Sequence, residues 1–74
     1  MTIKQLPYGR MQGYVIVEEY NDETDKTAVL WASEETSDAI IFPKDLRNRE
    51  IEYMYAAERD GVSAIIIEVK TEDN

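Results

Sequence analysis

The stretch from Ala28 to Phe42 constrains the fold of this chain most, because it predicts two strands joined by an acidic turn. Thr27–Ala32 is a short apolar run flanked by turn-forming residues, a pattern that favours a strand over a helix. Ser33–Asp38 has no apolar stripe to bury and is predicted as a loop, and Ala39–Phe42 is predicted as the next strand. Proline has no backbone N–H to donate to a ladder, so Pro43 ends that strand.

Two flanking stretches also predict strands. Residues 12–20 are rich in β-branched and aromatic side chains, and the polar cluster Asn21–Asp25 that follows them is typical of a turn. Val62–Val69 contains three successive isoleucines and predicts the last strand of the chain.

Residues 44–59 allow two interpretations. A helix would have Pro43 in its first turn and Gly61 just past its end, which is the favoured placement of these two residue types. The apolar positions of the segment, however, form only a ragged helical stripe. The helix therefore stays open as the alternative.

The favoured interpretation of the same segment is a hairpin over 50–58 and 62–70. Tyr53 and Tyr55 then share one strand face, where they are interpreted as a half-buried edge of the core. Arg59–Gly61 forms the tight turn, because glycine adopts positive φ without steric cost. Lys44–Asn48 is left as a short turn or 3₁₀ piece.

Five short strands around one core predict an all-β fold, a five-stranded Greek-key barrel of the OB or SH3-like kind. The alternative is an α+β fold in which a four-stranded sheet carries the helix at about 44–59. One barrel domain is predicted over residues 12–70, after a flexible N-terminal leader at 1–11 and before a polar tail at 71–74.

The composition argues against catalysis, because the 74 residues include no cysteine and no histidine. A disulfide framework and a thiolate metal site are excluded, and the usual general base is missing. We therefore expect no enzyme, no cofactor and no metal. No apolar run reaches the roughly 20 residues of a membrane-spanning helix, and residues 1–10 lack the apolar core of a secretory signal. A soluble, cytoplasmic protein is expected.

The charge of the chain indicates the kind of partner. The net charge is −8, and residues 12–42 carry eight acids against Lys26 alone. A field of this sign repels polyphosphate and attracts a basic protein surface. The plainer interpretation, in which the charge only keeps a small domain soluble, stays open.

The order of segments resembles the cold-shock domain, a family of small OB-fold proteins that bind single-stranded nucleic acid. The stretches similar to the family's opening strand, its two nucleic-acid motifs and its last hairpin are Met11–Val15, Lys26–Trp31, Asp38–Leu46 and Ile51–Val69. The resemblance covers about residues 11–70. It implies an OB barrel that binds single-stranded RNA or DNA, and this alternative assigns the contacts to Lys26, Phe42, Arg47 and Arg49.

The departures from the family concern its ligand surface. Its stacking aromatic residues are replaced here by Ala28, Leu30, Ile40 and Pro43, and its stacking histidine is replaced by Phe42. Stacking on aromatic faces supplies about 1–3 kcal/mol per base. The barrel is therefore predicted to be kept while the nucleic-acid surface is not.

On such a barrel the outward face of the first three strands presents an apolar patch with an acidic rim, formed by Tyr14, Ile16, Glu18, Leu30, Ile40 and Phe42. A patch of this kind indicates protein contact. A one-residue slip stays open, since it would turn the other apolar set outward, which includes Val15, Val17 and Ile41.

The leading hypothesis from the sequence is a non-enzymatic, acidic protein-binding module that acts through this patch. It could form a homodimer, or it could bind a basic partner as an inhibitor or nucleic-acid mimic. The alternative is a single-stranded RNA- or DNA-binding protein of the cold-shock kind.

Overall fold

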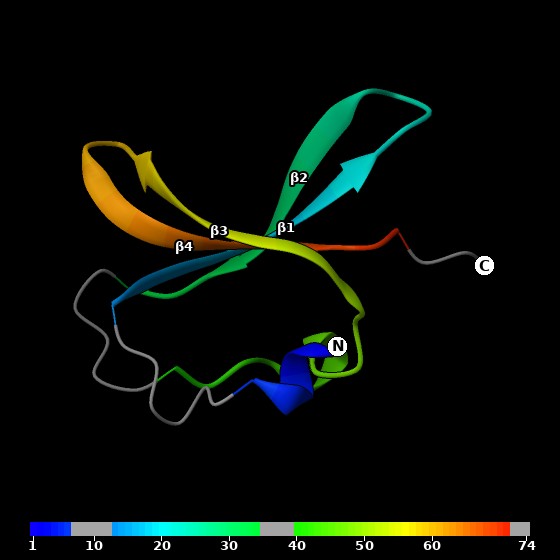
Figure 1. Cartoon of the computed structure of the whole chain (residues 1–74), viewed down its shortest axis with the longest axis horizontal. Helices are drawn as coiled ribbons and strands as arrows, with labels where there is room; N and C mark the ends of the chain where they lie inside the picture. The colour runs from blue at the N-terminus through cyan, green and yellow to red at the C-terminus, as the bar shows by residue number, and fades with distance from the viewer. Residues whose placement is uncertain (7–12, 35–39, 72–74) are drawn as a thin grey trace.

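The computed structural model describes residues 1–6, 13–34 and 40–71, which form a mixed four-stranded sheet and two 3₁₀ turns. The elements are η1 (Ile3–Gln5), β1 (Tyr14–Asn21), β2 (Lys26–Ala32), η3 (Lys44–Leu46), β3 (Ile51–Arg59) and β4 (Val62–Val69). The strand order is β2-β1-β4-β3, and a parallel β1–β4 pair joins two antiparallel hairpins (Figure 1). β2 and β3 are therefore the two edges of an open sheet.

Local turn chemistry explains both hairpins. In the β1–β2 turn, the side-chain oxygen of Asn21 accepts a hydrogen bond from the Glu23 N–H at 2.9 Å. In the β3–β4 turn, Asp60 and Gly61 have φ angles of 54° and 80°. Two consecutive positive φ angles are what a two-residue type I′ hairpin turn requires. The hairpin predicted over 50–58 and 62–70 is thus confirmed.

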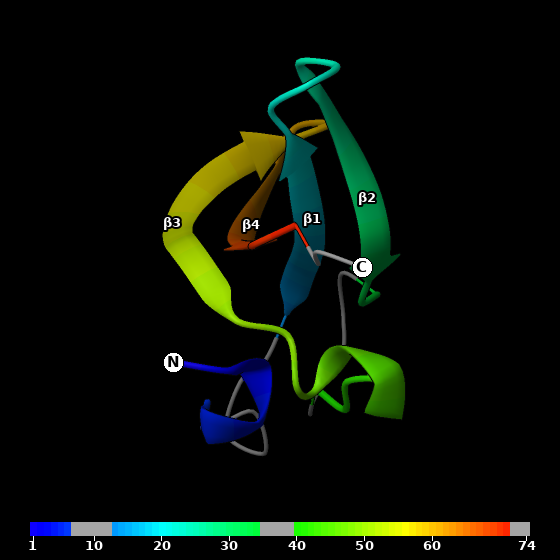
Figure 2. The ribbon, with the colours of Figure 1, turned by 90° about the vertical axis from the view of Figure 1, so that its right-hand side faces the viewer.

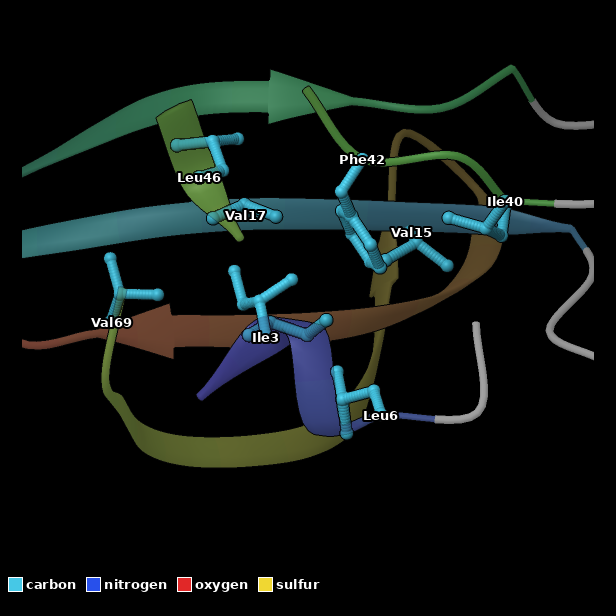
Figure 3. Packing of buried hydrophobic residues seen from close by; sticks show 9 residues of the cluster. Ile3, Leu6, Val15, Val17, Ile40, Phe42, Leu46 and Val69 are labelled. Carbon is cyan, nitrogen blue, oxygen red and sulfur yellow. The ribbon is translucent and has the colours of Figure 1, made fainter. Parts of the chain in front are cut away.

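The main core lies on one face of the sheet (Figure 3). Its buried side chains come from the two central strands, the N-terminal segment and the β2–β3 connection, and they are Ile3, Leu6, Val15, Val17, Ile40, Phe42, Leu46, Ile67 and Val69. Trp31 packs on Phe42 with 5.2 Å between the ring centroids and a tilt of 57°, a favourable aromatic arrangement. Burial of each large apolar side chain stabilises the fold by about 1.5–3 kcal/mol.

Residues 1–6 belong to this core, which corrects the prediction of a flexible leader for that part of residues 1–11. Ile3 and Leu6 are buried. The Ile3 N–H donates to the Arg49 carbonyl at 3.1 Å, and the Ile51 N–H donates to the Met1 carbonyl at 2.8 Å. Figure 2 shows the resulting position of η1 beside η3. Residues 7–11 lie outside the described part of the chain.

The third strand and the closed five-stranded barrel are also corrected. Residues 40–42 form no strand, and Ala39 lies outside the described residues. Ile40 and Phe42 are 1% and 0% exposed, whereas Ile41 is 70% exposed. The segment therefore packs on the sheet through alternate side chains and does not pair with it through the backbone. Without a fifth paired strand, the edges β2 and β3 remain apart.

The alternative helix at about 44–59 is wrong as well. Only Lys44–Leu46 forms a 3₁₀ turn, and Ile51–Arg59 pairs with β4 as β3. The all-β class is confirmed in the described residues. None of their helical segments has the length and apolar character needed to cross a membrane.

Candidate protein-interaction surface

The sheet has a second face, opposite the core, which the strand register defines. β1 and β4 pair Tyr14 with Ala64 and Ile16 with Ile66. Directly paired residues lie on the same face of a sheet, and successive residues alternate between the faces. Ile16, Ala64 and Ile66 form a smaller buried cluster here, with Tyr14 and Ala57 packed against it. All five residues come from strands, so this cluster is built from the sheet alone.

An ion pair spans the second face. Nη1 of Arg59 on β3 donates to Oε1 of Glu18 on β1 at 2.7 Å, across the intervening strand β4. The Glu18 carboxylate, as hydrogen-bond acceptor and as charge, raises the pKa of Arg59 above its ordinary value. Glu18 is only 2% exposed. The pair therefore links the outer strand β3 to the central strand β1.

The next residue of β1 makes an ion pair on the core face, since adjacent strand residues point to opposite sides. Nη2 of Arg49 donates to the Glu19 carboxylate, and it also donates to the Lys70 carbonyl at 2.8 Å. Arg49 is 8% exposed. This buried arginine ties the segment after η3 to the ends of β1 and β4.

Three consecutive residues of β3 carry large exposed apolar side chains, with Tyr53 and Tyr55 on the second face and Met54 on the opposite face. Tyr53, Met54 and Tyr55 are 59%, 51% and 43% exposed, and we call them the β3 edge surface. Among the described residues, β3 pairs with a strand on one side only, and on its other side the N-terminal segment contacts just its start, at Glu50 and Ile51. An edge strand presents unpaired backbone N–H and C=O groups to other chains. The β3 edge therefore combines free backbone with large side chains.

The opposite edge, β2, offers less. Val29 and Leu30 are 60% and 36% exposed, but both are aliphatic, and the aromatic Trp31 turns to the core beside Phe42. Aromatic side chains supply larger contact areas with directional preferences, and they are enriched in protein interfaces. Of the two described edges, β3 is the better candidate.

A shallow, polar depression of about 400 Å³ adjoins the β3 edge surface. We call it the acidic depression, and its lining residues are Tyr20, Asp22, Glu52, Tyr53, Glu68, Lys70 and Thr71. The β3–β4 register shifts between Ile51 and Tyr53, which leaves Glu52 as an additional residue in β3. Such bulges redirect a side chain, and this one explains how Glu52 and Tyr53 line the same depression.

Polar contacts hold one wall of the acidic depression. The Tyr20 hydroxyl donates to the Asp25 carboxylate, and the Thr71 hydroxyl donates to the Tyr20 carbonyl at 2.8 Å. The bond to Asp25 raises the pKa of Tyr20 above the ordinary 10.0, and the charges of Asp22 and Glu68 raise it further. Asp22 and Glu68 therefore place two carboxylates at the lining of the depression beside Tyr20.

The structure does not bring the patch predicted from the sequence to the surface. Ile40 and Phe42 are core residues, and Ile16 and Glu18 are buried on the second face. Only Leu30 is exposed, and Tyr14 is half-buried. The prediction assumed a third strand that shared the pleat of the first two. Because residues 40–42 form no such strand, the prediction placed Ile40 and Phe42 on the exposed side of the segment, whereas the structure buries them and exposes Ile41.

The residues of the nucleic-acid alternative are only partly accessible. Lys26 is exposed at the start of β2, and Phe42 has no exposed ring face on which a base could stack. Nε of Arg47 donates to the Phe42 carbonyl at 3.0 Å. Arg49 is buried in its contact with Glu19. Phe42 and Arg49 are therefore too buried to contact a nucleic acid.

The sequence interpretation missed the exposure of Tyr53 and Tyr55, which it placed at a half-buried edge of the core. It did assign both to one strand face, and the structure agrees on that point. Their exposure follows from the place of β3 at the sheet edge, which the local sequence does not encode. The sequence signal that could have indicated this exposure was the acidic residue Glu52 beside Tyr53.

Comparison of the chain with protein-family models, with curated proteins and with solved structures gave no match. The cold-shock resemblance therefore has no support beyond the order of segments.

Proposed function

We propose that this chain is a non-enzymatic protein-binding module whose contact surface is the β3 edge surface with the adjoining acidic depression. The observation that carries the proposal is the exposure of Tyr53, Met54 and Tyr55 at 59%, 51% and 43% on an edge strand. Exposed aromatic side chains with an acidic rim are typical of protein contact sites.

Charge supports a basic partner. The chain carries −8 overall, and Glu52 and Glu68 lie directly beside Tyr53 in the acidic depression. Complementary charge accelerates encounter and disfavours acidic partners. The absence of histidine and cysteine from the sequence supports the non-enzymatic part of the proposal.

Affinity capture tests this function. The full chain is immobilised, and an extract of the cells that produce it is passed over it. We expect captured proteins that are lost with the variant Tyr53→Ser/Tyr55→Ser. The control Val29→Ser/Leu30→Ser removes exposed apolar surface from the opposite edge and should retain them. Circular dichroism establishes that both variants are folded.

A second measurement separates this function from nucleic-acid binding. Labelled single-stranded DNA and RNA are titrated with the chain at low salt, where any phosphate contact is strongest, and fluorescence anisotropy is recorded. We expect no saturable change. Saturable binding, or capture that is equal for both serine variants, contradicts the proposed function.

A further inference from the structure

The β3 edge surface and the acidic depression are continuous, because Tyr53 belongs to both. Resting on the proposed protein-binding function, we propose that the partner contributes a basic segment in extended conformation. This segment adds to β3 as a further strand and places a lysine or arginine side chain in the acidic depression.

The backbone of β3 suits strand addition. The strand is nine residues long, Ile51–Arg59, and it forms one edge of the sheet in the described part of the chain. On its outer side, the N-terminal segment reaches only the start of the strand, through the bridge between Thr2 and Glu50 and the hydrogen bond from the Ile51 N–H to the Met1 carbonyl. When an extended peptide adds to an edge, main-chain hydrogen bonds supply affinity and side-chain pockets supply specificity.

The acidic depression has the chemistry to bind a cationic side chain. The carboxylates of Asp22, Glu52 and Glu68 outnumber the one ammonium group of Lys70 among its lining residues. The tyrosine rings at 20 and 53 also line it. Carboxylates form strong charge-assisted hydrogen bonds with lysine and arginine, and aromatic faces attract the same cations. The carboxylates and the tyrosine rings meet near the start of β3, where the bulge directs Glu52 into the depression.

A second copy of this chain fits the same edge less well. Antiparallel self-pairing centred on Tyr55 would set Glu52 of each copy opposite Glu58 of the other. Like charges directly opposite one another destabilise a strand pair. Two chains of −8 also repel each other as they approach. A basic segment, in contrast, meets these acids as counter-charges.

The test uses the full chain and a synthetic peptide of alternating lysine and valine, as long as β3. Binding is measured by isothermal titration and by amide shifts in ¹⁵N-resolved NMR spectra at low salt. We expect saturable binding, with shifts along Tyr53–Arg59 and at Glu68 and Lys70. A peptide with glutamate in place of lysine, and one N-methylated at alternate peptide bonds, should not bind.

Matched variants locate the cation site. Glu52→Gln/Glu68→Gln should weaken binding of the lysine peptide about tenfold, the factor that corresponds to 1.4 kcal/mol. Glu34→Gln/Asp45→Asn removes the same charge from exposed positions away from β3 and should leave affinity nearly unchanged. Equal loss in both variants shows a general charge effect and overturns the assignment of the cation to the depression.

Three further results overturn the inference. Equal binding of the N-methylated peptide excludes strand addition. Absence of peptide binding, with extract capture that still depends on Tyr53 and Tyr55, refutes the basic strand while the proposed function stands. Dimerisation seen by sedimentation and lost in Tyr53→Ser/Tyr55→Ser identifies a second copy as the occupant.

Discussion

The two faces of this sheet are buried by different means. The core face is covered by segments from outside the sheet, which contribute Ile3, Phe42 and Leu46 to a cluster of nine buried side chains. In the described residues, the second face has a cluster of three buried apolar side chains, all from strands, and the buried Glu18 carboxylate beside them pairs with Arg59. In the described part of the chain, segments from outside the sheet thus cover the core face, whereas the cluster on the second face is drawn from strands. The less covered face then lies beside an edge strand that keeps its tyrosines exposed.

The largest expected effect concerns the covering segment of the core face. Phe42→Ala should lower the free energy of unfolding by about 3–5 kcal/mol, because it removes a fully buried ring and leaves a cavity. A domain of this size has roughly 4–11 kcal/mol in total, so much of its stability would be lost. Urea unfolding followed by circular dichroism measures the change.

The control for this variant is its sequence neighbour. Ile41 is 70% exposed, and Ile41→Ala should change stability by no more than about 0.5 kcal/mol. Equal effects of the two substitutions would contradict the assignment of Phe42 to the core. They would instead favour the prediction from the sequence, in which Phe42 belongs to an exposed patch.

Ile67 and Ile66 compare the two faces directly, since they are adjacent in β4 and both are 0% exposed. Ile67 contributes to the large cluster and Ile66 to the small one. We expect Ile67→Ala to cost about 4 kcal/mol and Ile66→Ala about 2–3 kcal/mol, within the usual range for isoleucine. Thermal and urea unfolding check the order. Equal costs would show that the faces are equally well packed.

The ion pair over the second face should show strong coupling. Arg59→Met leaves the buried Glu18 carboxylate without its cation and should destabilise the fold, though by less than Ile67→Ala, because water reaches the arginine. Glu18→Gln/Arg59→Met should be more stable than Arg59→Met alone, since an unpaired buried charge costs more than none. A double-mutant cycle in urea measures this coupling, and additive effects would refute it.

The smallest expected effect is the contribution of Tyr20 to the pH dependence of the free energy of unfolding. The pKa of Tyr20 in the folded state lies above 10.0, so the folded chain holds this proton more tightly than the unfolded chain. Its stabilisation is present below pH 10.0 and is lost as the pH rises through the folded value. Tyr20→Phe should flatten the decline in stability that sets in as the pH rises above 10.0.

The controls for this titration again compare the faces. Asp25→Asn removes the carboxylate that accepts the Tyr20 proton, and the tyrosinate absorbance should then appear at lower pH. Ile67→Ala should lower stability while keeping the slope of the parent chain. An unchanged slope in Tyr20→Phe would show that Tyr20 does not link pH to folding.

Local signals in the sequence predicted the β3–β4 hairpin correctly. Asp60 and Gly61 are residues that accept positive φ, and the isoleucine run after them favours a strand. These signals act within a few residues, so they survive in any tertiary arrangement. The same holds for β1 and β2, whose bounds lie within two residues of the predicted ones.

The assignment of faces could not be predicted in the same way. In β1, both alternating sets are apolar, and the structure buries Val15 and Val17 in one cluster and Ile16 in the other. Alternation separated Ile40 and Phe42 from Ile41, but it did not show which side faced inward. Alternation of side chains with a period of two indicates a strand, but it does not show which face is buried when the residues of both faces are apolar.

The sequence by itself determined the strand-rich class, the two hairpin turns, the acidity, and the absence of histidine and cysteine. Only the tertiary structure decided that β1 pairs in parallel with β4, that residues 40–42 cover the core, and that β3 lies at an edge with Tyr53 and Tyr55 exposed. The reason is the range of the forces involved. Turn chemistry and strand propensity act between near neighbours, whereas strand order is set by pairing across some 50 residues, where burial must outweigh the entropy of closing a long loop.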